Sequence, residues 1–160
     1  MNLHELIKYS IDMTAQICMQ SIDDLSDGEL FHRPDPACNH INWQLGHLIV
    51  AEYGLIAKEF PKALPELPAG FADRYTKETA KLDDPKAFAT KAQLLEVHHK
   101  QRAAVLAALE KTSEAELGRK LEGWTPTVAA LFDAAAGAHW MMHVGQWAVV
   151  RRQLGRPPMF

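Results

Sequence analysis

Two histidines near the end of the chain are spaced so that their side chains could act together. His139 and His143 are four residues apart, so a helix would place their Cβ atoms on one face, roughly 5–6 Å from each other. Two imidazoles in that arrangement can bind one metal ion at about 2.0–2.1 Å each. The flanking run Ala134–Val144 is mostly apolar, so both rings should be buried and need partners for their nitrogens. A metal on one nitrogen and a hydrogen bond on the other would satisfy each ring.

The spacing of this pair also has a simpler interpretation. An isolated H-x-x-x-H pattern is common, and both residues could be core histidines with local hydrogen-bond partners. The chain has Trp140, not Glu, after the first histidine, so the H-E-x-x-H mechanism of metalloproteases is excluded.

A third histidine strengthens the case for a metal site. His47 lies in the apolar segment Trp43–Ile49, next to Gly46, which costs about 1 kcal/mol in a helix interior unless a close approach offsets it. Three imidazoles suit zinc, nickel or iron, and three protein ligands leave positions open, as in catalytic sites. Glu52 lies about 140° around the helix from His47, so we do not expect it to be a ligand.

The elements that must position these histidines are helices, and two of them occupy the first part of the chain. Apolar residues recur every three or four positions over residues 2–24 and again over residues 39–60. Asn39 is the expected N-cap of the second helix. Between the two helices, Ser26 and Glu29 match a capping box. No strand or hairpin pattern is present.

Two further helices are expected in the second half. Asp84 as N-cap with Pro85 at the first helical position predicts a third helix that ends near Glu110. Thr125, followed by proline, predicts the start of a fourth helix that ends near Leu154. The glycine after Leu154 suits the left-handed position that follows a helix.

A proline-rich segment joins the two helix pairs. Residues 61–84 are about 24 residues, which can run the full length of a bundle at roughly 3.3 Å per residue. Helices two and three could then run parallel. We therefore expect an all-α fold, a four-helix bundle with one long crossover between helices 2 and 3, as a single domain over residues 1–160.

Three tracts resemble a known family. Residues 42–48 (NWQLGHL) look like the conserved tract of the DinB-like, or YfiT-like, four-helix proteins. Residues 139–146 (HWMMHVGQ) resemble the H-x-x-x-H-x-G-Q signature of that family, and residues 154–157 (LGRP) resemble its usual ending. The resemblance implies the same bundle with its crossover.

The resemblance also implies a function. A three-histidine divalent-metal site carries over onto His47, His139 and His143. Family members with known activity include metal-dependent thiol S-transferases and a thiol-dependent isomerase, so a small thiol and an electrophile are the implied substrates. Members are often homodimers, and the small-residue run Ala134–Ala138 would let another backbone approach closely. The alternatives are a non-catalytic metal- or ligand-binding dimeric bundle of stress-related role, and a structural dimer whose histidines satisfy core polar groups.

Other residues could lie near such a site. The candidates for lining the pocket or supporting the ligands are Gln146, His40 and Trp43. Each also has a simpler explanation: Gln146 could be a surface amide, His40 could lie in a loop, and Trp43 could pack in the core. His98 and His99 are adjacent, so only one can face inward, and we expect a solvated face.

Composition excludes several classes of protein. The net charge of -3 argues against nucleic-acid binding. Cys18 and Cys38 are too few for a disulfide scaffold and have no C-x-x-C spacing, and Cys18 fits the core of the first helix. There is no signal-peptide pattern and no apolar run long enough for a membrane span. We therefore expect a cytoplasmic protein without a membrane partner.

Overall fold

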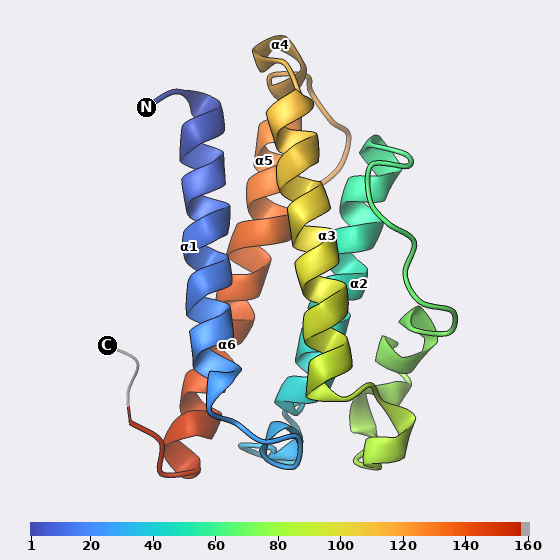
Figure 1. Ribbon diagram of the computed structural model, residues 1–160, viewed down its shortest axis with the longest axis vertical. Coiled ribbons are helices and arrows are strands. Elements are labelled where there is room, and N and C mark those ends of the chain that lie inside the picture. The colour runs from blue at the N-terminus through green and yellow to red at the C-terminus, as the bar shows by residue number, and fades with distance from the viewer. Residues whose placement is uncertain (158–160) are drawn as a thin grey trace.

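Long helices running along one axis form the molecule (Figure 1). The computed structural model describes residues 1–157. The long helices are α1 Leu3–Asp23, α2 Ile41–Glu59, α3 Lys91–Lys111 and α6 His139–Gln153. The shorter helices are α4 Glu114–Leu117 and α5 Val128–Asp133, and a π-helical turn, Ala134–Ala138, makes α5 and α6 one continuous rod. Short 3-10 turns are formed by Glu29–Phe31, Ala72–Tyr75, Thr79–Lys81 and Pro85–Ala87.

Helices α2 and α3 run parallel, as the length of the crossover predicted. Near the start of both helices, Asn42 donates to the carbonyl of Ala89, and farther along Gln101 donates to the carbonyl of Ile49. The crossover returns the chain along the outside of the bundle, beside α2 (Figure 1). The all-helical bundle is therefore confirmed. Within residues 1–157, no helix is both long and apolar enough to span a bilayer.

Several predicted helix ends are confirmed by their hydrogen bonds. Ser26 and Glu29 bond reciprocally, through side chain and backbone, as a capping box does. Gly155 has a φ of +72°. The N–H of Gly155 donates to the carbonyl of Arg152, and the next N–H donates to the carbonyl of Arg151. This pair of bonds is the Schellman arrangement, which satisfies the last carbonyls of a helix.

The starts of the other helices differ from prediction. The N-cap of α2 is His40, not Asn39, because the His40 ring nitrogen accepts from the N–H of Trp43. Asp84 and Pro85 start only a 3-10 turn, since Phe88 adopts an extended conformation and is buried in the core.

Helix α3 therefore begins later than predicted, at Lys91, with Thr90 and Gln93 forming its capping box. Helix α5 begins at Val128, capped by Thr127. Thr125 does not start it, because the segment just before the helix pairs with residues 119–121 in a short antiparallel bridge.

A layer of buried polar side chains divides the core. One apolar cluster fills the part of the bundle around Leu45 and Trp147, and a second surrounds Ile56 and Phe132. Along α1, α2 and α3, buried polar residues fall between the two clusters. They are Thr14, Glu52, His98, Gln101 and Arg102.

The crossover packs closely on α2. The ring of Tyr75 lies against the backbone of Gly46, where a Cβ atom would come within 2.1 Å of the ring. Only glycine allows this approach, which is the close contact that a helix-interior glycine predicted. The Tyr75 hydroxyl also accepts from the N–H of Ala89, which ties the crossover to the start of α3.

Candidate metal centre

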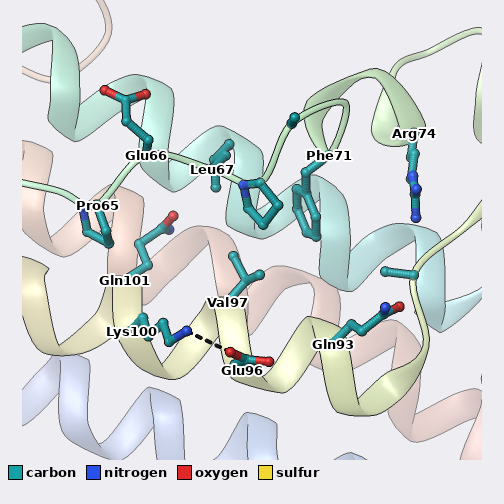
Figure 2. A pocket seen from close by; sticks show the side chains of 13 residues that line it. Pro65, Glu66, Leu67, Phe71, Arg74, Gln93, Glu96, Val97, Lys100 and Gln101 are labelled. Carbon is teal, nitrogen blue, oxygen red and sulfur yellow. Dashed lines mark hydrogen bonds and ion pairs between the residues drawn. The ribbon is translucent and has the colours of Figure 1, made fainter.

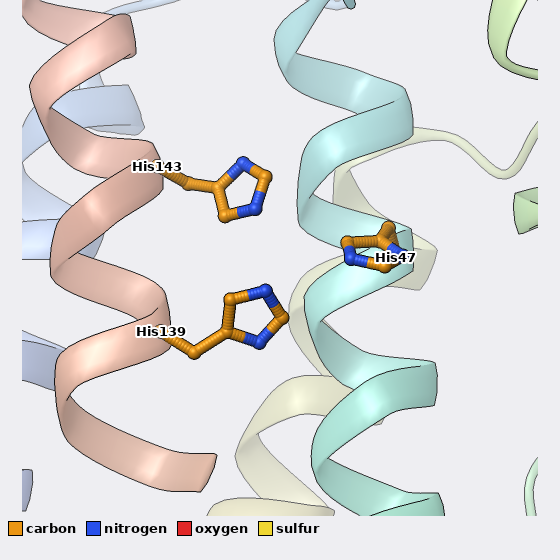
Figure 3. A group of neighbouring side chains, drawn as sticks. All are labelled: His47, His139 and His143. Carbon is orange, nitrogen blue, oxygen red and sulfur yellow. The ribbon is translucent and has the colours of Figure 1, made fainter. Parts of the chain in front are cut away.

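Three histidines from two helices meet in one cluster. His47 comes from α2, and His139 and His143 come from α6 (Figure 3). One ligand atom from each ring can be chosen so that all three atoms lie within 4.8 Å of one another. The ring centroids are 5.1 to 5.7 Å apart. The group contains no carboxylate and no thiol, so its donors are imidazole nitrogens alone.

A π-helical turn leads directly into the cluster. The N–H of His139 donates to the carbonyl of Ala134, five residues back, which is the π pattern. Arg102 of α3 donates to the carbonyl of Ala136 inside this turn. The widened turn ends where α6 begins, so it determines which way His139 and His143 point from the helix.

The rotation of α6 is also fixed from the core. The indole N–H of Trp140 donates to the carboxylate of Glu52 over 2.7 Å, and Arg102 pairs with the same carboxylate over 2.9 Å. The Arg102 guanidinium also lies 5.2 Å from the centre of the Trp140 ring. Because Trp140 follows His139 directly, this buried network holds the neighbouring histidine on the α2 side of the bundle.

A single amide determines the tautomer of His143. The Oε1 atom of Gln44 lies 2.9 Å from both the Trp147 indole nitrogen and the Nδ1 atom of His143. An indole N–H can only donate, so the shared amide atom is an oxygen. The Gln44 nitrogen in turn donates to the carbonyl of Asn39, which agrees with that orientation. His143 Nδ1 therefore carries the proton, and its Nε2 lone pair is free to bind a metal.

Burial keeps the cluster uncharged. It lowers the pKa of His143 to about 4, and the other two histidines of the cluster add to this shift. Burial also lowers the pKa of His47 and of His139. Neutral imidazole is the form that binds metal, because protons and metal compete for the same lone pair. The rings are therefore ready to coordinate at neutral pH.

Of the predicted neighbours, Trp43 lies at the cluster. Its ring stacks on His47 with centroids 4.9 Å apart and planes 4° from parallel. His40 instead caps α2, is fully buried, and bonds to the carbonyl of Leu82. Gln146 is exposed on α6. The amide that reaches the cluster is Gln44.

Sequence reasoning missed Gln44 as a functional residue. It lies three residues before His47, which places both on one face of α2, and that spacing was the available signal. The expectation of a solvated face for the His98–His99 pair was wrong for His98, which is buried against Trp140. Cys18 is buried, and burial raises its pKa to about 12, so it is an unreactive core residue.

The donor set fits a divalent transition metal. Imidazole nitrogens suit zinc, nickel and iron, whereas magnesium and calcium prefer oxygen ligands. His47, His139 and His143 are the residues that would hold such an ion.

Comparisons with known proteins agree with this architecture. A sequence model of the family described as the DinB superfamily matches residues 11–147. A solved structure from Enterococcus faecalis, described as the conserved protein of a locus, superposes with a TM-score of 0.70. The alignment covers 98% of this chain and 99% of the other at 17% identity, so the likeness concerns the fold alone. No curated protein matches the sequence.

Proposed function

This chain belongs to the DinB superfamily, and from that premise we propose that it is a divalent-metal-dependent enzyme acting on a small thiol. The observation that carries the proposal is the cluster of His47, His139 and His143, whose ligand atoms lie within 4.8 Å of one another. Three protein ligands leave further positions of an ion open to substrate, as in catalytic sites. The proposed metals are zinc, nickel or iron.

Each residue of the site has a defined part. The three histidines hold the ion, Gln44 keeps the Nε2 lone pair of His143 free, and Trp43 supports the ring of His47. A divalent ion bound there would lower the pKa of a coordinated thiol, so that a thiolate could attack an electrophile near neutral pH.

The absence of other reactive groups from the cluster favours thiol chemistry over hydrolysis. No Asp or Glu belongs to the cluster within residues 1–157, and Glu52 is already bonded to Arg102 and Trp140. A carboxylate base of the kind metalloproteases use is therefore missing. Cys18 is buried with a raised pKa, so an external thiol is the nucleophile we propose. The reaction is thiol transfer to an electrophile or a thiol-assisted isomerisation.

The metal site is tested by its stoichiometry. We expect about one divalent ion per chain after identical purification. The variants His47→Ala, His139→Ala and His143→Ala should each lose most of it, as measured by elemental analysis. His99→Ala removes an exposed histidine from α3 and should keep the ion. If all three cluster variants keep the wild-type content, the proposed ligands are wrong.

The activity is tested by turnover. Metal-loaded protein is offered a panel of low-molecular-weight thiols with a generic electrophile, and His143→Ala is the matched control. Thiol-dependent turnover should occur in the wild type and fall to the uncatalysed rate in the variant. Equal rates with every thiol would leave a non-catalytic metal- or ligand-binding bundle as the function.

We further propose a cytoplasmic homodimer. Both cysteines are free, as suits a reducing compartment. Of the run Ala134–Ala138 that prompted the dimer hypothesis, Ala135, Ala136 and Gly137 are buried within this chain, and a Cβ atom at Gly137 would lie 3.3 Å from the hydroxyl of Ser10 on α1. The support comes instead from exposed apolar side chains on α6, which are Met141, Met142 and Val149.

A further inference from the structure

A cavity lies between the crossover and α3, apart from the histidine cluster (Figure 2). Its volume is about 330 Å³, within the range of small-molecule sites. Leu67 and Phe71 of the crossover face Val97 of α3 across it. No histidine of the metal cluster lines this cavity. Seven of the 13 lining residues are apolar and six are polar or charged, so the cavity offers both an apolar surface and groups that can form hydrogen bonds or ion pairs.

One polar group at the cavity is buried without a partner. Gln101 is 1% exposed, and its Oε1 atom accepts no hydrogen bond. The Nε2 atom of the same amide donates to the carbonyl of Ile49 and to Glu52 on α2. Turning the amide over would place its oxygen against the Ile49 carbonyl oxygen, so the orientation is fixed. Figure 2 shows the side chain reaching from α3 towards the crossover.

A hydrogen-bond donor would stabilise the unpartnered Oε1 atom of Gln101. An unmade hydrogen bond in the interior costs free energy, and most buried polar groups are satisfied. A hydroxyl or N–H group of a ligand in the cavity would satisfy Gln101.

The charges around the cavity identify a second ligand group. Lys100 pairs with Glu96, and Glu66 accepts from the hydroxyl of Tyr53. Within the part of the chain described here, no carboxylate pairs with Arg74, which also lines the cavity and points towards α3 (Figure 2). A guanidinium binds a carboxylate through charge-assisted hydrogen bonds.

We propose that this cavity binds a small carboxylic acid with an apolar body and a hydroxyl or N–H donor. The donor bonds to Oε1 of Gln101, the apolar body packs between Leu67, Phe71 and Val97, and the carboxylate pairs with Arg74. The site is independent of the metal cluster, so it does not depend on the function proposed above.

The probe is para-hydroxyphenylacetate, titrated to millimolar concentrations and followed by two-dimensional ¹H–¹⁵N NMR. We expect saturable shifts at Leu67, Val97 and the side-chain amide of Gln101. Phenylacetate lacks the donor and should bind roughly fivefold more weakly, because the buried acceptor then stays unsatisfied. The amide analogue, para-hydroxyphenylacetamide, lacks the charge and should bind about tenfold more weakly.

Variants test whether the probes bind in the cavity and not elsewhere on the surface. Arg74→Gln should weaken the acid about tenfold while leaving the affinity for the amide analogue unchanged. Arg152→Gln, an exposed arginine at the end of α6, is the matched control and should bind the acid normally. Leu67→Trp fills the cavity from the crossover without touching the bonds of Gln101 and should abolish binding.

Three results would overturn the proposal: no saturable shifts with the wild type, shifts centred on the histidine cluster, or equal affinity for all three probes.

Discussion

At the scale of single residues, Gln44 connects the fold to the chemistry of the histidine cluster. Its amide oxygen accepts from both Trp147 and His143, and its nitrogen donates to the backbone at the start of α2. Such a supporting bond orients a metal-binding imidazole and fixes its tautomer. The proton on His143 is therefore set by an amide that cannot rotate without losing three hydrogen bonds.

Replacing this amide should weaken metal binding. We expect Gln44→Leu to lower the affinity for zinc about 10- to 100-fold, because His143 loses the partner that keeps its proton on Nδ1. Competition with a chromogenic chelator measures the affinity. Gln146→Leu changes an exposed amide on α6 and should have no effect. Equal losses in both variants would show that the Gln44 bond plays no part in binding.

The buried His98 should make stability depend on pH. Burial, with Arg102 and His99 nearby, lowers its pKa from 6.5 to about 3 in the folded protein. Between these values the unfolded chain binds a proton that the folded chain does not. The free energy of unfolding must therefore fall as the pH is lowered through this window.

Chelator-treated protein should accordingly lose stability between about pH 7 and pH 4, as measured by urea unfolding. His98→Leu removes one titrating group and should reduce that loss by about 1–3 kcal/mol. A variant whose stability falls as steeply as that of the wild type would show that His98 is protonated in the folded state.

At the scale of elements, the position of the crossover depends on Gly46. The ring of Tyr75 lies where a side chain at Gly46 would be, and Tyr75 also bonds to the start of α3. Gly46 directly precedes His47, so the contact between Tyr75 and Gly46, which positions the crossover on α2, is one residue from the metal cluster. The π-helical turn Ala134–Ala138 is likewise next to the metal cluster, because it ends where His139 begins α6.

Two glycines of α2 offer a matched test. Gly46→Ala should destabilise the protein by about 1–3 kcal/mol, because the new methyl group meets the Tyr75 ring and the buried ring must move. Gly54→Ala meets no atom within 4 Å and should stabilise by up to about 1 kcal/mol through helix propensity. Urea unfolding compares the two. Equal stabilisation by both would mean that the crossover is not packed on α2 in solution.

At the scale of the whole molecule, the polar layer ties the helices together between the two apolar clusters. Glu52 of α2 accepts from Gln101 and Arg102 of α3 and from Trp140 of α6. Breaking a buried ion pair by removing one partner is costly, so this junction favours one arrangement of the three helices. The junction includes Gln101, which lines the cavity, and Trp140, which follows His139 of the histidine cluster.

The exposed apolar side chains of α6 predict association. Met142 is 59% exposed and Val149 is 44% exposed, and together with Met141 they follow one side of the helix. Met142→Glu should convert a dimer into a monomer in sedimentation experiments, because a charge would be buried unpaired at the interface. Leu82→Glu places the same charge on an exposed residue of the crossover and should leave the dimer intact. A monomeric wild type at high concentration would contradict the homodimer.

The sequence by itself determined which segments are helical and which histidines could share a face. Helix periodicity and caps such as Ser26 with Glu29 depend on residues within one or two turns of each other, so local spacing predicts them. The length of the crossover limited how the helices could be connected, and the parallel course of α2 and α3 followed from it. The place of His47 on an apolar helix face suggested that it could join His139 and His143, and the family resemblance implied the same three ligands.

Only the tertiary structure decided which residues each helix face contacts. That Gln44 reaches His143, that His98 is buried, and that Phe88 ends the turn begun at Asp84 all depend on contacts between segments distant in the sequence. The same holds for Gln101, whose oxygen is unpartnered only because its nitrogen reaches α2. Local spacing fixes the direction of a side chain from its own helix, whereas its environment depends on how the helices and the crossover pack.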